Sequence, residues 1–113
     1  LRGFVMSTGV ITSFTLIDFP NESEMTAFFV FVEKNMEGLS DELRTSGMTK
    51  FYVSRVFNKG DKFTIGNWLE YQDQDAFAAC DEIWETFLAE SANRFNFVSK
   101  VVPYRGIVQY DFS

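Results

Sequence analysis

Histidine is absent from the 113 residues, which removes the commonest general base and the commonest metal ligand. The remaining residues form no Ser-His, Cys-His or CxxC arrangement and no glycine-rich phosphate loop, so neither a metal nor a cofactor is expected. Cysteine occurs once, as Cys80, and a single thiol excludes an intrachain disulfide. A chain without disulfides is typical of a reducing compartment, and a cytoplasmic location is therefore expected.

Positive charge is also scarce. Ten Lys and Arg residues stand against sixteen Asp and Glu residues, which gives a net charge of -6. Surfaces that bind nucleic acid or anionic lipid need clustered cations. The longest unbroken apolar run, Ala27–Val32, is far shorter than the ~20 residues that cross a bilayer. The sequence therefore predicts neither a nucleic-acid partner nor a membrane partner.

The first residues lack the apolar stretch and cleavage pattern of a signal peptide. Because the sequence opens with Leu1, we expect a processed, truncated or alternatively started product, with Met6 as a candidate start. The length fits one domain over residues 1–113.

Phenylalanine, by contrast, is abundant, with fourteen residues, and aromatic residues make up 18% of the chain. A domain of this size has a limited core, so some of the rings are expected to line a cavity or a subunit interface.

The first half of the chain predicts a strand followed by a helix. Residues 10–19 are rich in β-branched and aromatic side chains, which favours a strand. Asn21 and Glu24 have the spacing of a capping box that opens a helix. Apolar residues then recur at helical spacing, and Gly38 is the expected end of this helix. Residues 40–43 are expected to form a further short turn.

The next segment predicts a β-hairpin, with strands over residues 48–57 and 62–71. A tight loop at residues 58–61 would pair Phe51 with Asn67, Tyr52 with Gly66 and Val53 with Ile65. One face would then carry large apolar residues: Phe51, Val53, Phe57, Phe63, Ile65 and Leu69. The other would carry a mixed set: Tyr52, Ser54, Val56, Thr64, Gly66 and Trp68.

A second helix is predicted over residues 72–95, and a final strand over residues 96–112 with Pro103 at a bulge or a sheet edge. Cys80 falls on the apolar side of this helix and is expected to be an inert, buried thiol. The resulting order, β-α-β-β-α-β, predicts an α+β, ferredoxin-like fold with two helices on one face of a four-stranded antiparallel sheet. Because both faces of the hairpin carry aromatic residues, the face away from the helices is expected to meet a second copy in a homodimer.

The stretch from Phe63 to Phe77 places a strand tryptophan, Trp68, before a polar segment and the pair Ala76-Phe77 in a helix. In this pattern and in element order, the chain resembles the dimeric α/β barrels of the antibiotic-biosynthesis-monooxygenase (ABM) type. The resemblance implies two protomers packed sheet against sheet, each with a pocket between its sheet and its helices. It also implies oxidation of aromatic polyketides, through an asparagine four residues before the tryptophan. Here that residue is Thr64, and the haem-degrading relatives need a histidine that this chain lacks.

Small side chains on the mixed hairpin face predict the pocket. Ser54, Thr64 and Gly66 would leave space under aromatic residues of the two helices. The predicted ligand-binding set is therefore Trp68, Tyr52, Ser54, Thr64, Gly66, Phe28, Phe29, Trp84 and Phe87. The alternative is that the rings fill this space themselves, as dense native packing favours.

Three functions remain open. The first is binding of an apolar small molecule, such as a fatty-acyl, polyketide or aromatic compound. The second is a cofactor-free monooxygenase or cyclase acting on such a compound, with Trp68 and one of the four tyrosines, Tyr52, Tyr71, Tyr104 or Tyr110, taking part. The third is a structural homodimer with a closed pocket. No residue is assigned a catalytic role.

Overall fold

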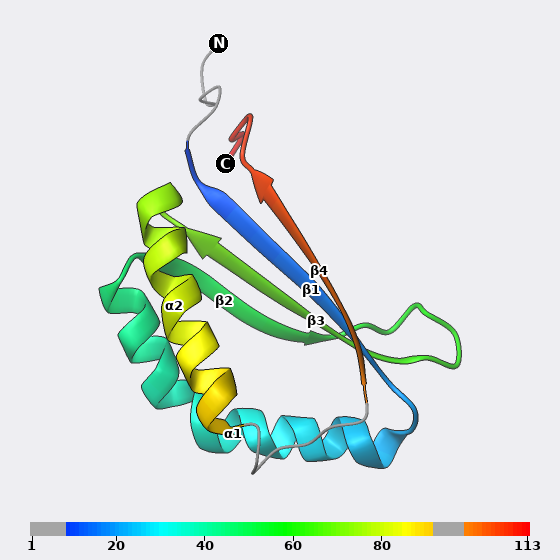
Figure 1. Ribbon diagram of the computed structural model, residues 1–113. Helices are drawn as coiled ribbons and strands as arrows, with labels where there is room; N and C mark the ends of the chain where they lie inside the picture. Colours follow the sequence, from blue (N-terminus) through cyan, green and yellow to red (C-terminus); the bar gives the residue numbers. More distant parts are fainter. Residues whose placement is uncertain (1–8, 92–98) are drawn as a thin grey trace.

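The computed structural model describes residues 9–91 and 99–113, and it has the predicted order of elements (Figure 1). The elements are β1 (Ile11–Phe19), α1 (Glu22–Thr45), β2 (Met48–Arg55), β3 (Phe63–Tyr71), α2 (Gln74–Ser91) and β4 (Lys100–Ile107). The strands form one antiparallel sheet in the order β2-β3-β1-β4. Both helices cover the same face of this sheet, so the ferredoxin-like prediction is confirmed. The ends of the last predicted helix and strand, residues 92–98, lie outside the described residues.

The start of α1 is the predicted one, but its end is not. Asn21 is the N-cap, and its side-chain oxygen accepts a hydrogen bond of 2.9 Å from the Glu24 backbone N–H. The helix then continues through Gly38 to Thr45, so the predicted end and separate turn are wrong. One helical glycine costs only about 1 kcal/mol, and burial of Leu39 and Leu43 in the core outweighs it.

Gly47 provides the actual stop after α1. Its φ angle is 109°, in the region that side chains other than glycine rarely adopt. A Cβ atom here would also lie 2.5 Å from the Cβ of Ala76 on α2. Glycine at this point therefore allows both the turn into β2 and the close approach of α2.

The hairpin register differs from the predicted one by two residues. Phe51 pairs with Leu69 rather than Asn67, and Tyr52 pairs with Trp68 rather than Gly66. The strands end earlier than the tight loop required, and residues 56–62 form a longer connection that extends beyond the sheet (Figure 1). An even shift keeps the side chains of the paired strands on their predicted faces, because side chains alternate along a strand. Val56 and Phe57 lie in the connection and so belong to neither face of the paired strands.

We call the face toward the helices the inner face and the opposite one the outer face. Alternate residues of β1 and β3, among them Ile17, Ile65 and Leu69, are buried on the inner face. The mixed hairpin set with Tyr52 and Trp68 therefore lies on the outer face, and its predicted position under the helices is wrong. The other apolar hairpin residues face the helices instead, except Phe57, which lies in the connection after β2 and is 94% exposed.

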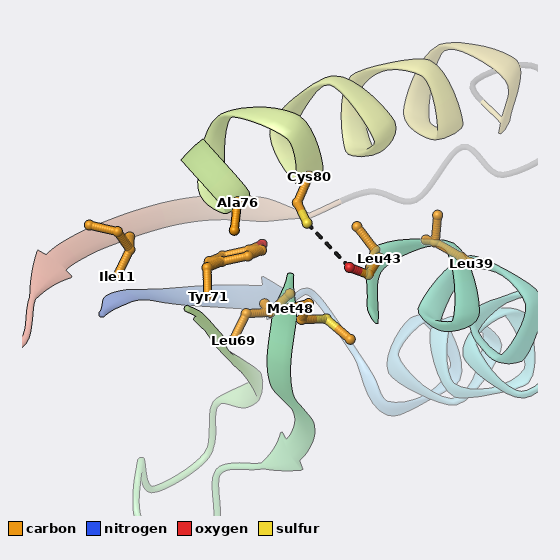
Figure 2. Packing of buried hydrophobic residues seen from close by; sticks show 8 residues of the cluster. All are labelled: Ile11, Leu39, Leu43, Met48, Leu69, Tyr71, Ala76 and Cys80. Carbon is orange, nitrogen blue, oxygen red and sulfur yellow. Dashed lines mark hydrogen bonds between the residues drawn. The ribbon is translucent and has the colours of Figure 1, made fainter. Parts of the chain in front are cut away.

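The core at one end of the inner face joins both helices to three strands (Figure 2). Its buried residues are Ile11, Leu39, Leu43, Met48, Leu69, Tyr71, Ala76 and Cys80. The Cys80 thiol donates a hydrogen bond of 3.5 Å to the Leu43 carbonyl oxygen, and burial raises the pKa of this thiol. The predicted burial of Cys80 is confirmed. Pro103 lies on the edge strand β4, where a missing N–H is tolerated.

Candidate functional site

A cavity of about 700 Å³ lies between the inner face and the two helices. All four strands and both helices contribute to its wall. Small-molecule sites in proteins typically occupy about 300–1,000 Å³, so this volume is large enough for a ligand of drug size.

Aromatic rings form the helical side of the cavity. Phe28 and Phe31 come from α1, and Trp84 and Phe87 come from α2. The Phe31 and Phe87 ring centroids are 5.8 Å apart, and the Trp84 ring meets Phe87 edge-on at 6.2 Å. On the sheet side, Phe51 meets the same Trp84 ring edge-on at 5.7 Å. Although the rings are large, they pack against one another around the cavity and leave its interior open.

The sheet side of the cavity has a polar patch at its centre. Ser13 and Thr15 of β1 and Asn67 of β3 line the cavity, and Thr15 and Asn67 are paired across the two strands. The Oδ1 atom of Asn67 is buried and has no hydrogen-bond partner. The same is true of the Oγ atom of Ser91, at the end of α2 and also in the cavity wall. Within the two described ranges, these are the buried side-chain polar atoms without a partner.

The charged groups of the cavity wall are Arg105, Asp81 and Glu85. Arg105 lies on β4, where its guanidinium Nη2 atom is 4.0 Å from Asp81 Oδ1 and its Cζ atom is 5.3 Å from the centre of the Phe77 ring. Both ion-pair side chains are partly exposed, at 49% for Arg105 and 43% for Asp81. Such pairs stabilise a fold by less than about 1 kcal/mol, but the carboxylate still balances the positive charge.

Tyr71 lines the cavity and is buried. Burial raises the pKa of its phenol to about 12, against a smaller opposing effect of the hydrogen bond with the Trp84 side chain. A phenol with this pKa stays protonated near neutral pH. Of the tyrosines considered as a base, Tyr71 is the one in the cavity wall, and its burial makes it a poor base.

Three of the nine predicted ligand-binding residues, Phe28, Trp84 and Phe87, line this cavity. Phe29 does not line it and packs against a second buried cluster around Met25 and Ile65. The other five predicted residues lie on the outer face, away from the cavity: Tyr52, Ser54, Thr64, Gly66 and Trp68. The reason is the inverted assignment of the two hairpin faces.

Asn67 was not among the predicted site residues, although one signal in the sequence identifies its face. It alternates with Ile65 and Leu69, so it belongs to the more apolar hairpin set. A sheet face covered by helices is expected to be the more apolar one. That rule would have placed Asn67 in the cavity and Trp68 outside it.

The outer face carries a row of aromatic residues across all four strands. The strand pairing aligns Tyr52, Trp68, Phe14 and Tyr104 in that order. The Phe14 and Trp68 ring centroids are 5.8 Å apart, and the Trp68 indole N–H donates a hydrogen bond of 2.8 Å to Glu70. The two outermost rings are more than half exposed, with 55% for Tyr52 and 56% for Tyr104.

Gly66 lies in the next row of the outer face, between Ser54 and Leu16. A Cβ atom at Gly66 would lie 3.2 Å from the Phe14 ring, which is tighter than normal contact. The missing side chain at Gly66 lets the Phe14 ring lie close to the sheet.

Comparisons with known proteins show the family and the fold. The family described as a domain of unknown function, DUF6974, matches residues 8–108. A dimeric ferredoxin-like protein from an uncultured marine organism is 32% identical, with a TM-score of 0.82 over 88% of this chain and 94% of that one. A second dimeric ferredoxin-like protein of that source is 26% identical, with a TM-score of 0.74 over the same shares, 88% and 94%.

A protein from Nitrosomonas europaea named as a candidate antibiotic biosynthesis monooxygenase is 14% identical, with a TM-score of 0.56 over 90% of this chain and 94% of that one. At this identity the likeness shows the fold alone, and it confirms the resemblance to ABM-type proteins at that level. No curated protein matches the sequence. Among the described residues, no helix has the length and apolar character needed to span a bilayer.

Proposed function

The chain belongs to the DUF6974 family, and from that premise we propose that it is a homodimer whose protomers each bind a mainly apolar small molecule between sheet and helices. The observation that carries the proposal is the cavity of about 700 Å³ between the inner face and the helices. A closed structural dimer would be expected to fill this space with its own side chains, because protein interiors pack densely.

The wall of the cavity favours an apolar ligand. Its helical side consists largely of aromatic rings, which provide contact area at a low cost in conformational entropy. The rings contact one another, as the Phe31–Phe87 and Phe51–Trp84 pairs illustrate, so a ligand would meet a preformed surface. Preformed sites lose less free energy to ordering when a ligand binds.

The outer face supports the homodimer. The helices cover the inner face alone, and the aromatic row from Tyr52 to Tyr104 is left partly exposed. Contiguous apolar patches of this kind are typical of subunit interfaces. Two of the similar structures are described as dimeric ferredoxin-like proteins. We therefore propose that two outer faces pack against each other.

The oxygenase or cyclase alternative has less support from the geometry. Trp68 and Thr64, which correspond to the residue pair expected in the cofactor-free oxygenases, lie on the outer face. Thr64 donates a hydrogen bond to Asp18 there. In the cavity, the pKa of Tyr71 near 12 is unsuited to proton abstraction at neutral pH.

Binding of N-phenyl-1-naphthylamine, an uncharged probe that fluoresces in apolar surroundings, tests the cavity. The variant Thr15→Phe would place a ring into the cavity from β1, while Thr86→Phe makes the same change on the exposed side of α2. We expect the parent protein and Thr86→Phe to bind the probe, and Thr15→Phe to bind it at least tenfold more weakly. Equal binding by all three proteins would place the probe elsewhere, and no binding by the parent protein would favour the closed structural dimer.

A further inference from the structure

We infer that the ligand of this cavity is an uncharged, mainly apolar molecule bearing a hydroxyl or similar hydrogen-bond donor, and that Asn67 selects for it. The inference rests on the proposed small-molecule function and names the class of ligand. It starts from the two buried polar atoms without partners in the described ranges, Asn67 Oδ1 and Ser91 Oγ, which belong to residues of the same cavity wall.

A buried polar atom without a partner is costly, because folding removes its hydrogen bonds to water and returns none. Native structures leave few such atoms. Two of them on one cavity indicate that something occupying the cavity provides their partners. Asn67 Oδ1 is an acceptor, so the partner must donate, and a hydroxyl or an N–H group does so.

The position of Asn67 makes it suited to selection. It lies on β3, a central strand, between Val53 on β2 and Thr15 on β1. Its backbone is held by strands on both sides, so the amide is presented from a rigid element. Apolar neighbours surround the patch, since Val53 and Leu69 line the cavity beside it. A hydrogen bond in such surroundings is stronger than one in water.

The charges in the wall argue against a carboxylate ligand. Arg105 is the one cation among the described lining residues, and Asp81 lies 4.0 Å from it. Glu85 adds a second negative charge to the same wall, so the three groups sum to a net negative charge. A ligand carboxylate would compete with Asp81 for Arg105 and would be repelled by both acidic residues. A free fatty acid is therefore a poor fit, whereas a neutral alcohol or phenol is a good one.

Ordered water is the competing occupant, since a polar patch in a cavity of this size can hold several molecules. Water could provide the hydrogen bond to Asn67 without making the site selective. A ligand group that displaces such a water must replace its hydrogen bonds or lose affinity. A selective site and a site that only holds water therefore differ in the relative affinities that they show for ligands of equal size.

Three naphthalenes of equal ring size form the test: 2-naphthol, 2-methylnaphthalene and 2-naphthoate, each measured by displacement of N-phenyl-1-naphthylamine. We expect 2-naphthol to bind about tenfold more tightly than 2-methylnaphthalene, which is the effect of one net hydrogen bond. We expect 2-naphthoate to bind most weakly. If the methyl compound binds as tightly as the naphthol, or the naphthoate binds best, the inference is wrong while the proposed function stands. If none of the three displaces the bound probe, the inference is wrong and the proposed function stands. If the probe itself does not bind, both fall.

The variant Asn67→Leu tests whether Asn67 causes the preference for 2-naphthol over 2-methylnaphthalene. It replaces the amide with an apolar group of similar size, and we expect it to bind both neutral compounds with equal affinity. Asn35→Leu is the matched control, since Asn35 lies on α1 outside the cavity and donates to the Phe31 carbonyl oxygen. This control should keep the tenfold preference. If Asn67→Leu fails to fold, Asn67→Val suits a strand better and has the same expected result. A preference that persists in the Asn67 variant would overturn the assignment.

Discussion

The inner and outer faces of the one sheet use their aromatic residues in different ways. On the inner face, rings from both helices and β2 surround about 700 Å³ of space, with Asn67 in its wall. On the outer face, the rings of Tyr52, Trp68, Phe14 and Tyr104 form a row that remains partly exposed. The high aromatic content thus has two explanations, one for each face. In our proposal, the inner face binds a ligand and the outer face packs against a second copy.

The largest contrast is expected in stability. Ile65 is fully buried on the inner face, so Ile65→Ala should lower the free energy of unfolding by about 2–5 kcal/mol. Leu16 is partly buried on the outer face, and Leu16→Ala should cost clearly less in the monomer at low protein concentration. Denaturant unfolding measures both values. Equal losses would mean that the outer face is as much a part of the monomer core as the inner face.

The next contrast concerns dimerisation. Leu16→Asp would put a charge on the outer face, in the row next to the aromatic one, and we expect the dimer to dissociate about a hundredfold more readily. The matched control is Val30→Asp, which puts the same charge at an exposed apolar residue of α1. Sedimentation velocity over a range of concentrations gives both dissociation constants. If both changes alter the dissociation constant to a similar extent, the interface does not lie on the outer face alone.

The alkaline limit of stability tests the burial of Tyr71 beside the cavity. Its folded pKa is raised from 10.0 to about 12, so the folded state holds the phenol proton more tightly than the unfolded state. Stability is therefore unaffected below pH 10 and falls between pH 10 and 12, by up to about 2–3 kcal/mol. Tyr71→Phe lacks this proton, and the difference between the two proteins isolates the effect from other titrating groups. A constant difference across this range would mean that Tyr71 is exposed.

Gly66→Leu gives the smallest expected effect and separates the faces most cleanly. The new side chain would press on the Phe14 ring, since even a Cβ atom would lie 3.2 Å from it. We expect the dimer to weaken by about tenfold while binding of N-phenyl-1-naphthylamine changes by less than about twofold. A loss of probe binding with an intact dimer would mean that Gly66 lines the cavity, and it would contradict the assignment of faces.

The order of elements could be predicted from the sequence because each element has a clear local signal. The β-branched run before Pro20, the Asn21 cap and the apolar spacing of α2 are all local. The prediction that α1 ends at Gly38 was wrong, because the helix is continued by the burial of Leu39 and Leu43. That burial depends on strands and a helix distant in sequence, which local patterns do not reveal. The hairpin register was wrong by two residues because it relied on the turn, which turned out to be a longer loop.

The candidate site could be predicted only in part. The helix residues Phe28, Trp84 and Phe87 were found because the apolar side of an amphipathic helix packs on the sheet. The strand residues were assigned to the wrong face, because alternation separates two sets without saying which set the helices cover. Asn67 could not be identified as an unpaired group, since hydrogen-bond partners are visible only in three dimensions.

Native mass spectrometry of the protein with 2-naphthol tests the central claim most directly, because it counts chains and ligands together. The account predicts a dimer carrying two naphthol molecules, one in each inner-face cavity. A dimer carrying one molecule would place the ligand between the two outer faces. A monomer carrying one molecule would contradict the role of the outer face, and a dimer without ligand would contradict that of the inner face.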